Sequence, residues 1–239
     1  MQQEQSNQSP SKTSESRRVD FKPPDYEGDA PSGRTRGTAS RGCSLARSDS
    51  GEGLEISALI PSDSRGLTGS ESPTIWLDVS YNQSKMIGKK VVGEFSLEEV
   101  QTNKKILPKR TKVTLPSNSG FFSIPIPQSL ESNKWYRWYL VLDCNFVSSS
   151  NSNSILSLEG LVKRVELPEL KHQLKTQSVE EKISIYAQQG LWYDALNETA
   201  QLSCNQPDNP YSGKVWAILL KEIGLDSISQ KLPQCKNQF

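Results

Sequence analysis

Histidine is nearly absent from this sequence, since His172 is the single one among 239 residues. A triad built on His172 would need a nucleophile motif such as GxSxG, which is absent. The HExxH, GxxxxGK(S/T) and GxGxxG motifs are absent too. Ser9 and Lys12 fit an SxxK pattern without its supporting motifs, and Glu98 and Glu99 would point to opposite faces of a strand. We therefore expect a protein that is not an enzyme, with no catalytic residue and no cofactor.

Net charge is also nearly absent, since 28 Lys and Arg residues face 27 Asp and Glu residues. Such a balance gives no long-range field for nucleic acid or an anionic membrane. No apolar run approaches the roughly 20 residues that cross a bilayer. The first 18 residues also lack the apolar core of about 7–15 residues that a secretory leader needs. We expect no nucleic-acid partner and no membrane span, and a cytoplasmic chain or else the mature form of an exported one.

Hydrophobic side chains are few in the first 50 residues, which contain nine. They are Met1, Val19, Phe21, Tyr26, Ala30, Ala39, Cys43, Leu45 and Ala46. This is too little apolar surface to offset the entropy that the chain loses when it becomes ordered. The sequence therefore predicts an N-terminal arm over residues 1–52, disordered as far as about Gly37.

Alternating apolar residues predict strands repeatedly between residues 54 and 166. The segments are 54–60, 74–81, 90–99, 104–115, 121–126, 135–144 and 155–167. In the clearest of them, Tyr136, Trp138, Leu140, Leu142 and Cys144 share one face. Short strands at this spacing, with no helix between them, predict an antiparallel, immunoglobulin-like β-sandwich domain over residues 53–167.

After residue 167 the apolar period changes to that of helices. Ser178 and Glu181 form a capping box, and Gly190 is placed to end the helix that they begin. Asn209 is the N-cap of a further helix that has Pro210 in its first turn. The whole fold is therefore expected to be mainly β plus α, with a small C-terminal helical hairpin or bundle over residues 168–239.

Three tryptophans are candidates for an interaction surface, namely Trp76, Trp135 and Trp192. Trp76 and Trp135 lie on the opposite parity from the inferred core faces of their strands, so both rings need cover. The C-terminal helices could supply that cover. Alternatively, the rings could form a carbohydrate-stacking platform or the site of another partner. The sequence leaves these alternatives open.

A run of basic residues marks segment 104–115, which we interpret as a hairpin. Its cations have no acid between them; they are Lys104, Lys105, Lys109, Arg110 and Lys112. One interpretation is a charged edge that prevents two sheets from pairing edge to edge. The other is a contact with an anionic polysaccharide or with a protein. Nucleic acid is disfavoured because no stacking aromatic residues interleave with the cations.

The four cysteines, Cys43, Cys144, Cys204 and Cys235, lie 101, 60 and 31 residues apart. These spacings match no zinc site, so we expect no metal, and the absence of CxxC excludes thioredoxin-like chemistry. Either the thiols are unrelated, or one or two disulfides form in an oxidising compartment. A Cys43–Cys144 bond would tie the end of the arm to the sandwich. A Cys204–Cys235 bond would hold the C-terminal tail on the second helix.

Two resemblances add to these expectations. The stretch YAQQGLWYDALNETAQLSCNQP, residues 186–207, resembles half of a tetratricopeptide repeat. A single such unit cannot form a solenoid, so this resemblance implies a helical hairpin docked on the sandwich. The segments GTASRGC, LIP, GLT, PTIWLDV, WYRWYL, EGLVKRVEL and YAQQGLWYDALN together resemble a cyanobacterial family of unknown function, from Gly37 to the C terminus.

The second resemblance implies export. Members of that family typically begin with a secretory leader, which implies a periplasmic or extracellular location, although this sequence begins without one. The resemblance also implies that the positions of Cys43 and Cys144 recur together, which fits a disulfide. Its genes often neighbour those for secreted adhesin-like proteins, which implies an accessory role by association. It supplies no catalytic residues.

We therefore hypothesise a non-catalytic, exported adaptor that binds a protein partner through the sandwich and its helical cap. The alternative is a module that binds carbohydrate or the cell envelope through exposed tryptophans and the basic hairpin. An enzyme of unfamiliar type is the third hypothesis.

Overall fold

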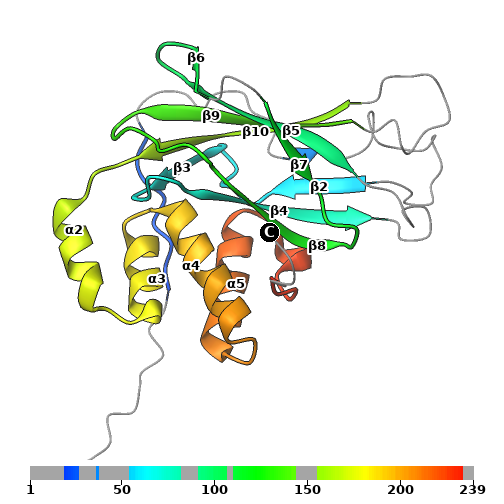
Figure 1. Cartoon of the computed structure of the whole chain (residues 1–239). Helices are drawn as coiled ribbons and strands as arrows, with labels where there is room; N and C mark the ends of the chain where they lie inside the picture. Colours follow the sequence, from blue (N-terminus) through cyan, green and yellow to red (C-terminus); the bar gives the residue numbers. More distant parts are fainter. Residues whose placement is uncertain are drawn as a thin grey trace, which may run out of the picture.

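The structure is a computed structural model of the chain, and it describes residues 19–26, 36–37, 54–81, 91–106, 110–143 and 155–233. Two β-sheets and a set of C-terminal helices make up this part of the chain (Figure 1). Several residues singled out above lie outside it: Ser9, Lys12, Cys43, Lys109, Cys144 and Cys235.

The first sheet has four strands in the order β1-β2-β4-β8, and every neighbouring pair is antiparallel. Its strands are β1 (Arg36–Gly37), β2 (Leu54–Ala58), β4 (Thr74–Tyr81) and β8 (Gly120–Pro125). The second sheet has the order β3-β10-β9-β5-β6, and β7 also pairs with β5. Its strands are β3 (Arg65–Thr68), β5 (Val92–Glu99), β6 (Lys104–Lys105), β7 (Thr111–Thr114), β9 (Trp135–Asp143) and β10 (Ile155–Arg164).

The alternating faces of these strands form the core between the two sheets. On β9, Tyr136, Trp138, Leu140 and Leu142 are buried, which confirms the phase read from the sequence. Phe95 of β5 stacks on Trp138 with ring centroids 6.5 Å apart. Because side chains alternate across a strand, the residues between these positions face outward.

Strand β3 departs from the predicted antiparallel arrangement. It pairs in parallel with the end of β10, with Arg65 opposite Leu161. The chain leaves β2 of the first sheet through the buried Leu59 and Ile60 and turns at Ser64, whose φ is 65°. It therefore enters the second sheet running in the same direction as β10. The expectation of a wholly antiparallel sandwich is wrong at this pair, and the second sheet is mixed.

The basic segment is not a hairpin on its own, which corrects the interpretation from sequence. Both β6 and β7 pair with β5, with Lys105 opposite Glu98 and Lys112 opposite Glu94. The segment is thus the return arm of a hairpin whose other arm is β5, and Asn103 adopts a φ of 53° in the turn. The alternation of β5 favoured this pairing because it places glutamates on the strand beside the cations.

The C-terminal region is helical, as predicted. Its helices are α2 (Pro168–Gln173), α3 (Val179–Gln188), α4 (Trp192–Asn205) and α5 (Pro210–Glu222), with 3₁₀ turns η1 (Leu174–Thr176) and η2 (Asp226–Ile228). The capping box is confirmed: Ser178 Oγ accepts from the Glu181 amide at 3.2 Å, and Glu181 Oε2 accepts from the Ser178 amide at 3.1 Å. Gly190 follows α3 with a φ of 68°, and Asn209 Oδ1 caps α5 by accepting from the Tyr211 amide.

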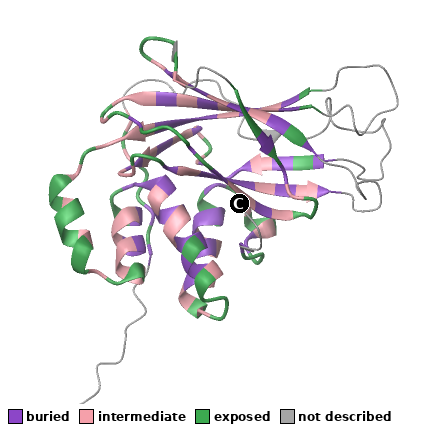
Figure 2. Ribbon diagram, viewed as in Figure 1, coloured by how far each residue is buried: buried purple, intermediate pink, exposed green. Residues whose placement is uncertain are grey.

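Helices cover the outward face of the first sheet. Trp76 of β4 points toward them and is 1% exposed, with its ring edge-on to Trp216 of α5 at 6.2 Å. Phe121 of β8 packs on the same ring at 4.9 Å. One core cluster therefore includes residues of both sheets and of α3, α4 and α5, and buried positions run through all of these layers (Figure 2). The predicted boundary at residue 167 marks a change of secondary structure within a shared core.

Residues 19–26, which we call the strap, are ordered against this body (drawn in blue in Figure 1). Val19 and Phe21 are each 6% exposed, and the Lys22 amide donates to the Ala187 carbonyl of α3 at 3.1 Å. The prediction of disorder as far as about Gly37 is therefore wrong for the strap and for β1. Composition averaged over 52 residues conceals a local cluster of apolar side chains in VDFKPPDY.

Candidate functional site

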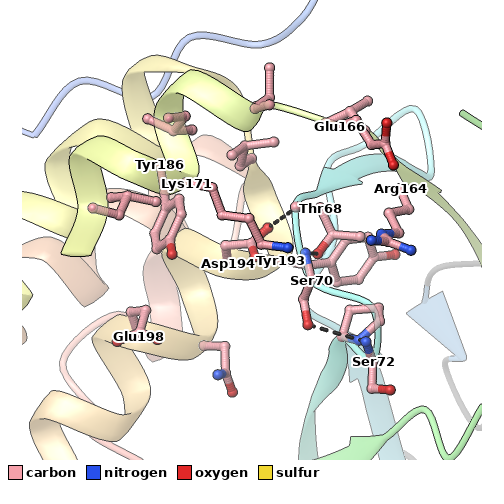
Figure 3. Close-up of a pocket in the computed structure, with 18 of the residues that line it drawn as sticks. Thr68, Ser70, Ser72, Arg164, Glu166, Lys171, Tyr186, Tyr193, Asp194 and Glu198 are labelled. Atoms are coloured by element: carbon pink, nitrogen blue, oxygen red, sulfur yellow. Dashed lines mark hydrogen bonds between the residues drawn. The ribbon is translucent and has the colours of Figure 1, made fainter. Parts of the chain in front are cut away.

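A groove of about 500 Å³ opens where the end of β10 meets the helices (Figure 3). Its walls are residues 68–74, which leave β3, residues 164–168 at the end of β10, and the helices α2 and α4. Apolar lining comes from Val165, Leu167, Leu170, Leu174 and Leu191. Charged groups of both signs border it, namely Arg164, Glu166, Lys171, Asp194 and Glu198. The groove is therefore amphipathic, with no single dominant charge.

Helix α2 forms the outer wall of the groove. It has no buried residue, and Leu170 together with Leu174 of η1 lines the groove. Glu169 lies in the first turn of α2 and Lys171 and His172 in its last, so each end carries the charge that suits the helix dipole. His172 is exposed and does not line the groove. The wall is thus held by local helix-forming residues and presents apolar side chains to an open space.

Asp194 joins the opposite wall to the sheet. It lies in the first turn of α4, and its Oδ2 accepts from the Gly69 amide at 2.9 Å. Desolvation raises the pKa of this carboxyl to about 6, while hydrogen bonds from Gly69 and Thr68 oppose part of the rise. Tyr186 of α3 lines the same wall, and desolvation together with the charges of Asp194 and Glu198 raises its pKa to about 12. This bond therefore holds α4 against the β3–β4 connection, and we call it the latch.

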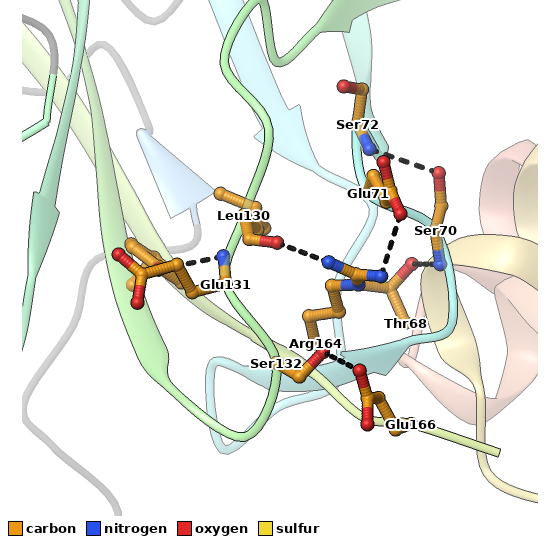
Figure 4. A network of polar contacts seen from close by, with 10 residues as sticks. Thr68, Ser70, Glu71, Ser72, Leu130, Glu131, Ser132, Arg164 and Glu166 are labelled. Carbon is orange, nitrogen blue, oxygen red and sulfur yellow. Dashed lines mark hydrogen bonds and ion pairs between the residues drawn. The ribbon is translucent and has the colours of Figure 1, made fainter.

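Arg164 is committed to a network at the rim (Figure 4). Its Nη1 donates to the Leu130 carbonyl at 2.7 Å, and its Nη2 pairs with Glu71 Oε1 at 2.9 Å. Close by, Ser132 Oγ donates to Glu166 Oε1 at 2.8 Å. The guanidinium thus fastens the 130–132 loop and the β3–β4 connection to the end of β10. Its charge is already paired with Glu71, and its buried Nε has no hydrogen-bond partner among the described residues.

Polar side chains that line the groove bond to other parts of the protein. Asp194 is bonded to backbone and hydroxyl donors, and Tyr193, which also lines the groove, donates its hydroxyl to the Leu161 carbonyl at 3.0 Å. In the part of the chain that the structure describes, no group of three or more His, Cys, Asp or Glu residues is placed to hold a metal ion. What the arrangement can do is bind a ligand with apolar and polar parts.

The tryptophans predicted as interaction candidates are mostly covered. Trp76 lies beneath α5, and its Nε1 donates to Asn197 Oδ1 at 3.2 Å. Trp192 is fully buried, with its Nε1 donating to the Leu59 carbonyl at 2.9 Å. Trp135 is half-buried beside Tyr26 of the strap, 5.6 Å away, and the Lys163 ammonium. Trp76 and Trp192 are thus covered by protein groups, whereas Trp135 keeps part of its surface exposed.

The basic candidates that the structure describes lie on an exposed edge beside β5. Lys104 and Lys105 form β6, and Lys112 is exposed on β7. Arg110 pairs with Glu94 of β5, Nη1 to Oε2 at 2.9 Å, with both side chains largely exposed. An acidic strand thus accompanies the cations, which lowers the local positive field available to an anionic ligand.

Of the disulfide candidates, Cys204 lies within the described residues. It stands near the end of α4 and is disulfide-bonded. The other three cysteines lie outside the part of the chain that the structure describes. The proposed Cys43–Cys144 and Cys204–Cys235 pairings therefore stay predictions.

Sequence reasoning missed the groove and its latch. Asp194 appeared only as a polar position within the helical motif LWYDALN, and Thr68 and Gly69 only within the turn segment GLT and the residue after it. A usable signal was the carboxylate in the first turn of a helix that begins without a side-chain cap at Leu191. Such a carboxylate stabilises the helix dipole and is free to accept from a neighbouring backbone amide.

Comparison with known proteins gives a family and no function. No curated protein matches the chain. No helix among the described residues has the length and apolarity needed to traverse a bilayer. The model of a domain of unknown function, DUF928, matches residues 36–232, which include both sheets and all of the helices above. The chain therefore belongs to the DUF928 family.

Proposed function

We propose that this chain is a non-catalytic module that binds protein partners through the groove between α2 and α4. The observation that supports this proposal is the groove itself: apolar lining, a rim of both charges and about 500 Å³ of open space. A protein segment suits such a site, because its apolar side chains fill the floor while its polar groups pair at the rim. A small anion would find Arg164 already paired with Glu71.

Helix α2 is the element that we propose as the contact surface. Leu170 and Leu174 are directed to the groove instead of the common core, and neither is fully buried. Apolar side chains that remain on an open recess with a polar rim are typical of protein interaction sites.

Export and the finer fold assignment form part of the same proposal. The family resemblance supports a periplasmic or extracellular location, and a disulfide at Cys204 fits an oxidising compartment. The two stacked sheets support an immunoglobulin-like sandwich, with β3 as a parallel addition. The α3–α4 hairpin, closed at Gly190, supports the likeness to half of a tetratricopeptide repeat. The burial of Trp76 and Trp192 favours the protein-binding proposal over the carbohydrate alternative, for which Trp135 is the one partly exposed indole of the three.

Site-specific photocrosslinking tests the proposal. A photoreactive residue at Leu170 should capture a defined protein from the native envelope or cytoplasmic fraction, and the same residue at Val92 serves as a matched control. Val92 is also an exposed apolar position, at the start of β5 and away from the groove lining. Leu174→Asp, in a turn with no buried residue, should lower capture at Leu170 at least tenfold without unfolding the chain. Equal capture at both positions, or capture unchanged by Leu174→Asp, contradicts the groove as the binding site.

A further inference from the structure

The strap lies against a surface that we call the recess, formed by Arg65, Trp135, Gly190 and Trp192. Its exposure alternates: Val19 and Phe21 are buried, whereas Asp20 and Lys22 are exposed, and Tyr26 is half-buried. The strap belongs to neither sheet, and its Lys22 amide makes one backbone bond to the Ala187 carbonyl. Recognition through alternate side chains of an extended segment is how many peptide-binding grooves work.

The position that receives Phe21 is formed by the body alone. The ring meets Trp192 edge-on, with centroids 5.0 Å apart and an interplanar angle of 80°. Trp192 is held independently by the bond from its Nε1 to the Leu59 carbonyl. An aromatic side chain entering this position therefore finds a partner whose orientation is already fixed.

The next position fits proline through the backbone of Gly190. With φ at 68°, Gly190 leaves space that a Cβ would fill, since that atom would lie 2.7 Å from Pro24 Cγ and 2.8 Å from the Lys22 carbonyl oxygen. Glycine suits this position for two reasons: it adopts the left-handed backbone without strain, and it lets the strap approach closely. The recess thus accepts an extended segment only because this residue has no side chain.

Tyr26 occupies the last position. Its ring lies 5.6 Å from Trp135 and beneath the Arg65 guanidinium, which is 4.4 Å from the ring centroid. Arg65 Nε is itself held by Asp63 Oδ2 at 3.0 Å. The site therefore offers a cation and an indole to a second aromatic side chain, a combination that favours tyrosine or phenylalanine.

The strap is an accessory to the domain that carries the recess. The family match begins at residue 36, so the strap lies outside it, whereas Gly190, Trp192, Trp135 and Arg65 all lie within it. The nine residues 27–35 join the strap to β1 and span at most about 30 Å. A short tether of this kind gives an effective concentration on the order of 1 mM.

We propose that this recess is a binding site for extended segments of partner proteins with the pattern apolar–x–aromatic–x–x–Pro–x–aromatic, and that the strap occupies it in cis. The strap thereby sets a threshold that a competing segment must exceed. This site is distinct from the groove of the proposed function: Leu191 and Tyr193 line the groove, whereas Gly190 and Trp192 contact the strap. Either proposal can fail without the other.

Peptide competition on the full-length chain tests the proposal. The probe is a synthetic peptide of residues 17–28, titrated by calorimetry into the unaltered chain and into a chain carrying Phe21→Ala and Tyr26→Ala. The altered chain should bind with a Kd at least tenfold below the apparent Kd of the unaltered chain, because its own strap no longer competes. A peptide with the same two substitutions should not bind. A Val92→Ala chain, altered at an exposed position of β5 that is not among the strap contacts described above, should behave as the unaltered chain.

Three outcomes overturn the proposal. One is a folded Phe21→Ala, Tyr26→Ala chain that does not bind the probe at 1 mM. Another is equal affinity for both chains. The third is a concentration-dependent dimer of the unaltered chain that the probe dissociates, since the occupant is then a second copy and not a different partner.

Hydrogen exchange on the unaltered chain keeps the test decisive where the double variant does not fold. The Lys22 amide, bonded to the Ala187 carbonyl, should exchange at least 100-fold faster than the amides of Leu140 and Leu142 in the core of β9. Exchange of the Lys22 amide only with global unfolding would mean that the strap never leaves the recess, and the proposal would be wrong.

Discussion

Tyr193→Phe removes one hydroxyl at the place where α4 meets the second sheet. That hydroxyl accepts from Trp138 Nε1 of β9 at 3.2 Å and donates to the Leu161 carbonyl of β10 at 3.0 Å. All three groups are buried, and the tyrosine is 2% exposed. Through these two hydrogen bonds the hydroxyl connects α4 to both β9 and β10.

The expected loss of stability follows from those two bonds. Phenylalanine keeps the ring and its packing, so no cavity larger than the hydroxyl arises. A buried indole N–H left without an acceptor costs about 1–3 kcal/mol, and loss of the bond to the carbonyl costs about 1 kcal/mol more. We therefore expect the free energy of unfolding to fall by about 2–4 kcal/mol. For a chain of this size that lowers Tm by roughly 5–15 °C.

Tyr139→Phe is the matched control, because it deletes a hydroxyl from the same strand, β9. Its hydroxyl donates to Glu98 Oε1 at 2.7 Å in a partly exposed setting, where water can replace it. We expect a loss within about 1 kcal/mol. Urea unfolding and calorimetry of both variants decide the matter. A Tyr193→Phe protein as stable as Tyr139→Phe would refute the claim that this hydroxyl fastens the helices to the sandwich.

Three further changes have defined outcomes. Gly190→Ala should lower the free energy of unfolding by more than about 1 kcal/mol in urea titrations, because φ is 68° and the new Cβ would meet Pro24. Burial raises the folded-state pKa of Asp194 to about 6, so the folded state binds a proton more tightly than the unfolded chain does. The free energy of unfolding should therefore rise as the pH falls from about 6 toward 4. In urea titrations at several pH values, Asp194→Asn should remove up to about 3 kcal/mol of that rise. Arg110→Gln, which breaks an exposed ion pair, should change stability by less than about 1 kcal/mol and less still at high salt.

Local patterns in the sequence predicted the elements well where a pattern repeats over several residues. The alternation of Tyr136, Trp138, Leu140 and Leu142 identified β9 and its inward face. The parity of Trp76 indicated an outward ring that needs cover, and α5 provides it. In each case a single element determines which side is buried, so neighbours in sequence suffice.

Long-range placement is what the sequence did not yield. The parallel pairing of β3 depends on where the chain crosses between sheets, which four residues such as RGLT cannot specify. The order of the strap depends on residues far along the chain, since Phe21 packs on Trp192, 171 residues later, and the Lys22 amide bonds to Ala187, 165 residues later. The groove likewise arises from Asp194 meeting Gly69, two residues that no local pattern relates.

The distribution of the five indoles gives the protein an intrinsic optical signal. Trp76, Trp138, Trp192 and Trp216 are at most 1% exposed, and Trp135 is half-buried. Emission from the native chain should therefore lie at short wavelength and resist acrylamide, with Trp135 as the quenchable fraction. Departure of the strap would uncover Trp192 and Trp135 while Trp76, Trp138 and Trp216 stay protected. Acrylamide accessibility can thus tell detachment of one segment from loss of the whole tertiary structure, without any added label.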